Sequence, residues 1–225
     1  MYPCSRLSKK HSFPEGINKV YEIIYKEFGP QDWWPGDSKI EIIVGAILTQ
    51  AVSWSNVEKA ISNLKENNIL SIQKLDEIDQ NKLAQLIKPS GYYNMKARKL
   101  KSFVQYIKEN YNASLNNFSE GKPEQKRSEL LEIYGIGPET ADSILLYAFD
   151  KPVFVIDTYT KRILSRIGYI KENISYDKLQ NKIAENLEED HNLYNEYHAL
   201  LVKLAKENCF KSSPLCIDCP INNNL

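Results

Sequence analysis

Residues 130–141 read LLEIYGIGPETA, and this stretch decides the fold. Apolar residues at helical spacing lead up to Gly135, which can take the positive φ that ends a helix. Pro138 then stands at the first position of a new helix, where its missing N–H costs nothing. Two helices joined by a tight turn are therefore expected. The N–H groups that open the second helix could hold a phosphate, and a simple helical hairpin with a glycine cap is the alternative.

The rest of the chain carries the same helical periodicity. Apolar residues recur every three or four positions, for example at Ile17, Val20 and Ile24. The one extended candidate, VFVI at 153–156, is short for a strand. The sequence thus predicts an all-α protein of about ten short helices.

The composition is that of an ordinary folded protein, with 42% hydrophobic and 26% charged residues in a chain of 225. This length fits one large domain or two interlocked small ones. No apolar run approaches the ~20 residues of a membrane span, and the opening MYPCSRLSKKHSF lacks the apolar core of a signal peptide. We therefore expect a protein of the cytoplasm or nucleoid, with no membrane partner.

The charges are balanced in number but not in position. The chain has 29 basic and 29 acidic residues, and zero net charge argues against a nucleic-acid partner. Residues 80–108, however, hold seven cations and no acid, whereas acidic residues gather at 185–190. Such a local field can attract the phosphates of DNA, and a solvated helix face is the alternative.

Asp157 closes the extended segment and precedes a helix expected near 158–167. Its ordinary role is to cap that helix, since Asp is favoured at this position. A capping carboxylate accepts backbone N–H bonds and stays ionised, so it could also stabilise an oxocarbenium ion or orient water against a sugar. Asp157 is thus the candidate catalytic residue.

Two of the three tryptophans flank one short helix. Trp34 lies before it, within Trp33-Trp34-Pro35, and Trp54 follows it, just after Gln50. The two rings could pack in the core, or they could line a pocket that stacks a flat base.

Three cysteines near the C-terminus follow the pattern Cys209-x6-Cys216-x2-Cys219. Outside an oxidising compartment this spacing favours metal ligands over disulfides. Iron–sulfur clusters normally take four thiolates, and the fourth cysteine of the chain is Cys4. A [4Fe–4S] cluster is therefore a candidate cofactor.

Together these motifs resemble the helix-hairpin-helix DNA glycosylases of the endonuclease III superfamily, over roughly residues 17–219. The hairpin, Asp157, Leu48-Thr49-Gln50, the segment PSGYYNMKA at 89–97 and the cysteine tail occur in the family's order. Trp33-Trp34-Pro35 and the PSGYYN piece look most like the 3-methyladenine glycosylase branch, often labelled endonuclease III-related.

The resemblance implies a two-domain fold with the active site between the domains. Residues 38–148 would form a six-helix domain, with the helix-hairpin-helix at about 126–148. Residues 1–37 and 149–225 would form the second domain, which carries Asp157 and the cysteine loop. It also implies a monomer that acts on double-stranded DNA with a damaged or mismatched base.

The resemblance further implies a role for each matching residue. The hairpin and the cations of 82–101 would hold phosphates, two loops would fill the gap in the duplex, and the base would flip into a pocket. The hairpin and cation group is Gly135, Gly137, Lys96 and Arg98; the loop residues are Gln50 and Tyr92; and the pocket residues are Trp34, Trp54 and Glu139.

Two positions depart from the family pattern. Glu139 stands where bifunctional members carry the lysine that attacks the sugar, and a carboxylate cannot form that imine. Base removal by water, without lyase activity, is therefore implied. The family's fourth cysteine would fall at Leu225, so that either Cys4 replaces it or the cluster is lost or labile.

The substrate expected is an alkylated purine such as 3-methyladenine. It carries positive charge, leaves readily and is attracted to aromatic faces. Two tryptophans with no nearby histidine and no lysine nucleophile suit it. The alternatives are removal of uracil or thymine from mismatches with guanine, and a non-catalytic DNA-binding module, which Asp157 disfavours.

Overall fold

The structure is a computed structural model that describes residues 12–33 and 36–225. Over these ranges it contains thirteen α-helices, one 3-10 helix (η1) and no strand, which confirms the all-α prediction. The count exceeds the expected ten because short segments such as α4 (Ile72–Glu77) and α7 (Leu115–Ser119) also form helices. Residues 153–156 are extended but belong to no sheet.

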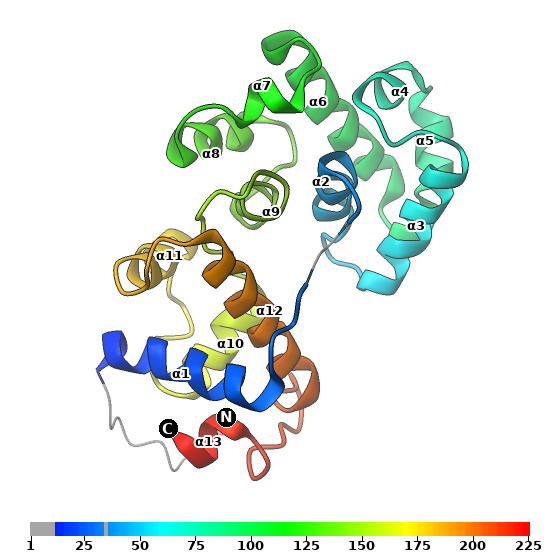
Figure 1. Cartoon of the computed structure of the whole chain (residues 1–225). Coiled ribbons are helices and arrows are strands. Elements are labelled where there is room, and N and C mark those ends of the chain that lie inside the picture. Colours follow the sequence, from blue (N-terminus) through cyan, green and yellow to red (C-terminus); the bar gives the residue numbers. More distant parts are fainter. Residues whose placement is uncertain (1–11, 34–35) are drawn as a thin grey trace. The chain divides into compact units, whose positions relative to one another are not determined.

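The chain divides into two compact units, Met1–Trp33 with Pro152–Leu225, and Trp34–Lys151. The helices of the first unit are α1 (Phe13–Phe28), α10 (Thr158–Arg166), α11 (Tyr176–Ala184), α12 (His191–Glu207) and α13 (Pro220–Asn224). Besides α4 and α7, those of the second are α2 (Lys39–Leu48), α3 (Trp54–Glu66), α5 (Gln80–Leu86), η1 (Lys88–Ser90), α6 (Tyr93–Tyr111), α8 (Pro123–Glu132) and α9 (Pro138–Phe149) (Figure 1).

The second unit is built around α2 and α9. The sequence of α2, KIEIIVGAIL, is apolar on nearly every face, which is typical of a fully buried helix. It packs against α9, α6 and α3 (Figure 1). Ile43, Val44 and Ile47 of α2 are completely buried. Because α2 packs against α9, this core supports the second helix of the hairpin.

The first unit is held together by α12, which packs against α1 and α10. The buried hydroxyl of Tyr197 on α12 donates a hydrogen bond to the carbonyl of Ile17 on α1, at 2.7 Å. Residues from both ends of the chain thus share one core.

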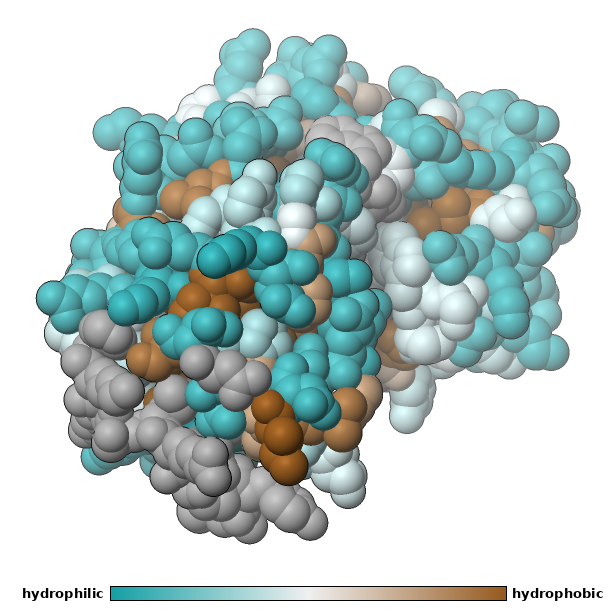
Figure 2. Space-filling model, turned by 60° about the horizontal axis from the view of Figure 1, so that its bottom comes forward, coloured by the Kyte–Doolittle hydropathy of each residue, from teal (hydrophilic) through white to brown (hydrophobic). Residues whose placement is uncertain are grey.

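The surface is mostly hydrophilic on the face that Figure 2 shows, with small separate apolar areas. Among the helices that the structure describes, none has both the length and the apolar character that crossing a membrane requires.

Candidate active site and DNA-binding surface

The hairpin joins α8 to α9 through Ile133–Gly137. Gly135 has φ 81°, and Gly137 is the N-cap of α9, which begins at Pro138 as the sequence predicts. The N–H groups of the first turn of α9 have no acceptor within the helix. They therefore form a site suited to an anion.

Gly135 is also required by a close contact. A Cβ at this position would clash with Cγ of Lys99, which runs beneath the turn. The Lys99 ammonium donates to the side-chain oxygen of Gln50. The Gln50 amide nitrogen in turn donates to the Gly135 carbonyl at 3.1 Å and to the Thr140 hydroxyl at 2.9 Å. The Gln50 side chain therefore braces the hairpin in this structure.

The two hairpin helices are clamped by an ion pair. Arg127 on α8 binds the carboxylate of Asp142 on α9 through two nitrogens, at 2.7 and 3.3 Å. Asp142 is completely buried, and removing one partner of such a pair typically costs ~3–5 kcal/mol. The pair fixes the angle at which α9 leaves the turn.

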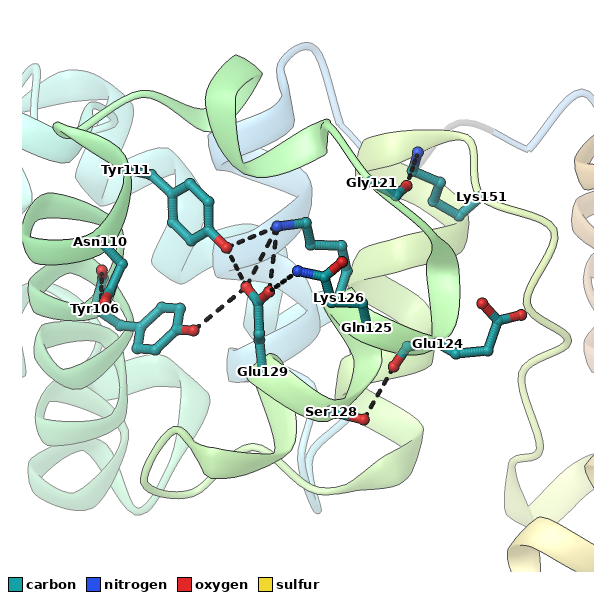
Figure 3. Close-up of polar contacts among 10 residues, drawn as sticks. All are labelled: Tyr106, Asn110, Tyr111, Gly121, Glu124, Gln125, Lys126, Ser128, Glu129 and Lys151. Atoms are coloured by element: carbon teal, nitrogen blue, oxygen red, sulfur yellow. Dashed lines mark hydrogen bonds and ion pairs between the residues drawn. The ribbon is translucent and has the colours of Figure 1, made fainter.

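A second polar cluster anchors α8 to α6 (Figure 3). Lys126 is 3% exposed, and its ammonium donates to the Tyr111 hydroxyl at 2.7 Å and lies 3.3 Å from Glu129. Glu129 also accepts hydrogen bonds from Tyr106 and Tyr111. Burial tends to raise the pKa of Glu129, but the hydrogen bonds outweigh it and hold the pKa below its ordinary value. The cluster is thus a satisfied, partly buried network that ties the first hairpin helix to α6.

Tyr92 projects from the surface at the N-cap of α6. It is 70% exposed and has φ 45°, directly after Gly91 at φ 63°. An aromatic residue in the left-handed region is strained, and such strain often accompanies function.

The cations of α6 fall into two groups. Arg98 is exposed and stacks over the Tyr134 ring on the hairpin, with Cζ 4.1 Å from the ring centroid. Lys96, by contrast, is 2% exposed, and its ammonium donates to the carbonyls of Leu48 and Ser90. Lys101 likewise donates to the carbonyls of Asp76 and Ile78. We expected Lys96 to bind a DNA phosphate, and this prediction is wrong, because its ammonium is buried and cannot reach DNA.

Asp157 is placed by the extended segment and by α10, within the first unit. The buried residues 153–156 have their backbone bound by α11 side chains: Gln180 donates to the Phe154 carbonyl at 2.7 Å, and Tyr176 accepts from the Ile156 N–H at 3.2 Å. Asp157 is then the N-cap of α10, and its Oδ1 accepts from the Thr160 N–H at 2.7 Å.

The other carboxylate oxygen faces a histidine. Oδ2 of Asp157 lies 3.6 Å from Nε2 of His198 on α12, and the two side chains are 12% and 6% exposed. Burial pushes the pKa of Asp157 up, but His198 and Thr160 outweigh it, so that the pKa lies below its ordinary value. The expectation of no nearby histidine was therefore wrong.

His198 in turn stacks against an aromatic neighbour. Trp33 stacks on it with ring centroids 5.8 Å apart and planes at 21°. No sequence signal marks His198, because α12 is far from Asp157 along the chain and its apolar periodicity continues through this position.

The remaining pocket candidates lie as follows. Trp54 is half-buried at the start of α3, with its ring against Gly45 of α2. Glu139 is exposed in the first turn of α9. Trp34 lies outside the described residues, and so does Cys4.

The C-terminal cysteines lie in one loop of the first unit. Burial raises the pKa of the Cys219 thiol, and the neighbouring thiols of Cys209 and Cys216 raise it further. Arg166 donates to the Cys209 sulfur at 3.2 Å. Within the described ranges, no three His, Cys, Asp or Glu side chains are arranged to hold a metal. These residues alone therefore do not fit a [4Fe–4S] cluster, which takes four thiolates.

A model of the HhH-GPD superfamily of base excision DNA repair proteins matches residues 44–189. This chain belongs to that superfamily. A relative from Methanocaldococcus jannaschii, which is named as a DNA repair glycosylase, is 46% identical over 95% of this chain and 96% of its own length. Endonuclease III of Thermotoga maritima is 28% identical over 81% of this chain and 80% of its own length. The chain is accordingly a base excision repair DNA glycosylase of the endonuclease III superfamily.

Solved structures of the superfamily agree. The H. pylori 3-methyladenine DNA glycosylase bound to 1,N6-ethenoadenine matches with a TM-score of 0.74 and 30% identity, over 88% of this chain and 98% of that one. A non-covalent endonuclease III–DNA complex matches with a TM-score of 0.80 and 20% identity, over 94% of each chain. The endonuclease III-like fold is therefore confirmed.

Proposed function

We propose that this glycosylase is monofunctional and removes an alkylated purine such as 3-methyladenine, with Asp157 as its catalytic residue. The observation that carries the proposal is the mostly buried Asp157 carboxylate, whose pKa lies below its ordinary value. It is an anion at neutral pH, so it can face the positive charge that develops on a sugar.

DNA binding would come first. The hairpin amides and Arg98 are exposed or half-exposed on the second unit and can meet phosphates. Tyr92 and Gln50 lie on the two loops proposed to fill the duplex when a nucleotide flips out. Flipping costs a few kcal/mol of stacking and pairing, which these contacts would offset.

Bond cleavage follows in the pocket. The bond between the base nitrogen and C1′ breaks, and its electron pair leaves with the base. Asp157 stabilises the resulting oxocarbenium ion, and water adds to C1′ and releases a proton. Because Glu139 cannot form an imine with the sugar, the product is an intact abasic site.

The substrate class rests on two supports. A cationic purine is attracted to aromatic faces by ~2 kcal/mol or more when desolvated, and Trp34 and Trp54 are the rings proposed to supply them. The 30% identical H. pylori structure is that of a 3-methyladenine glycosylase, which favours the same class here.

The test is a panel of duplex oligonucleotides. They carry 3-methyladenine, 7-methylguanine, uracil or thymine opposite guanine, or an oxidised pyrimidine, and strand cleavage is read before and after alkali. We expect alkali-dependent cleavage at the alkylated purines. Release of uracil or thymine alone would overturn the substrate class, and binding without any release would overturn the enzymatic proposal.

We also propose that Cys4 completes the thiolate set with Cys209, Cys216 and Cys219. The proposal is supported by the spacing Cys209-x6-Cys216-x2-Cys219 and by the leucine at position 225. Because the three C-terminal thiols are not arranged to hold a metal in this structure, cluster binding would require the C-terminal loop to rearrange. A bound [4Fe–4S] cluster would be a fixed structural element of this loop.

A further inference from the structure

Lys96 is a buried cation that connects two separate loops. It lies in the first turn of α6, and its Nζ donates to the Leu48 carbonyl at 2.8 Å and to the Ser90 carbonyl at 2.6 Å. Lysine is almost never fully buried unless it is paired. The role of the buried Lys96 ammonium therefore depends on which two loops the Leu48 and Ser90 carbonyls begin.

The first acceptor fixes the start of the Gln50 loop. Leu48 is the last residue of α2, where backbone carbonyls have no partner within the helix and where the helix dipole favours a cation. The loop that follows carries Gln50 and then Ala51, whose φ is 56°. A charge-assisted bond to Leu48 holds the chain immediately before this strained turn.

The second acceptor fixes the start of the Tyr92 loop. Ser90 ends η1 and directly precedes Gly91 and Tyr92, both with positive φ. On the other side of Tyr92, the Lys96 backbone N–H donates to the Tyr92 carbonyl at 3.0 Å. Lys96 therefore holds the chain before Tyr92 with its side chain and after Tyr92 with its backbone.

We propose that Lys96 is a positioning residue that sets the spacing of the Gln50 loop and the Tyr92 loop, so that both can enter the duplex together when a nucleotide flips out. Lys96 itself does not touch DNA. This inference rests on the proposed function, because it assumes that the two loops fill the gap.

Lys101 offers a matched control on the same helix. Its ammonium also donates to two backbone carbonyls, those of Asp76 and Ile78, but these lie in the last turn and at the C-cap of α4. Lys96→Met and Lys101→Met therefore each remove one lysine that holds two carbonyls. Only the first loosens the proposed insertion loops.

The experiment compares binding to a duplex with a tetrahydrofuran abasic-site analogue and to the same duplex undamaged. A 2-aminopurine beside the analogue reports unstacking by its fluorescence. We expect Lys96→Met to lower the preference for the damaged duplex about tenfold and to abolish the fluorescence rise, since bonds to a charged group are lost. Affinity for the undamaged duplex should not change, and Lys101→Met should keep the wild-type preference.

Each other outcome is decisive. Lys96→Gln keeps one donor, so it should lie between the wild type and Lys96→Met, and thermal unfolding of each variant checks that it is folded. An unchanged preference in Lys96→Met, an equal loss in both methionine variants, or unfolding of both Lys96 variants would show that Lys96 serves stability alone. A wild-type protein that shows no preference for the damaged duplex would overturn the proposed function and this inference with it.

Discussion

Oδ2 of Asp157 lies 3.6 Å from Nε2 of His198, beneath the ring of Trp33. The contact joins the residue after the extended segment to the middle of α12, and it is one of the causes that lower the pKa of Asp157. The proposed catalytic carboxylate therefore depends on a residue that is not its neighbour in sequence.

Replacing His198 should shift the pH dependence of base release. Without the histidine, burial is less well opposed, so the pKa of Asp157 should rise. The acid limb of the single-turnover rate should move to higher pH in His198→Gln, and on that limb the rate falls about tenfold per pH unit. His191→Gln, at the start of the same helix, is the control and should leave the profile in place. An unshifted profile in His198→Gln would remove His198 from the account.

The enzyme should show no lyase activity. Glu139 stands at the lysine position, so borohydride should trap no covalent enzyme–DNA adduct during turnover. The measurement is a denaturing gel of the reaction mixture with labelled DNA. Efficient trapping would show that another lysine, such as Lys151 or Lys161, forms the imine, and alanine variants of these two would identify it.

Truncating the tryptophans should affect charged bases most. Stacking contributes ~1–3 kcal/mol per aromatic platform for any base, and a cation–π contribution adds to it only for a cationic purine. Trp34→Ala and Trp54→Ala should therefore each slow release of 3-methyladenine more than release of uracil, measured by single-turnover rates in matched duplexes. Trp54→Phe, which keeps a ring against Gly45, should lose less. Equal losses on both bases would mean that the rings only stack or pack.

Any iron–sulfur cluster should depend on Cys4. Four thiolates are the usual requirement, and the three C-terminal cysteines supply only three. Protein purified without oxygen should be brown and contain iron, and Cys4→Ser should lose both the colour and the iron. Colourless wild-type protein without iron would leave the C-terminal loop with no cluster.

The fold was largely predictable because its signals are local. Gly135 and Pro138 mark the two ends of the turn by their backbone requirements, and Asp157 marks a helix start by its capping side chain. These properties belong to single residues or to short spacings, so a sequence shows them directly.

The site was less predictable because the burial of Lys96 and the environment of Asp157 depend on residues that are distant in the sequence. Lys96 lies in a run of cations that is typical of a solvated face, yet carbonyls from two other segments allow it to be buried. His198 occupies an apolar stripe of α12 and meets Asp157 only through the packing of α12 against α10. Neither contact leaves a spacing that a sequence could show.

The most direct test of the account is the single-turnover rate of Asp157→Asn on DNA that contains 3-methyladenine, together with its affinity for that DNA. Asn retains the cap of α10 but removes the negative charge, a loss of ~3–4 kcal/mol of transition-state stabilisation. Asp190→Asn, which changes the cap of α12 in the same way, is the control. The account predicts that base release falls by a factor of roughly 100–1,000 in Asp157→Asn alone, with binding and folding retained. An Asp157→Asn variant that releases the base at the wild-type rate would contradict it.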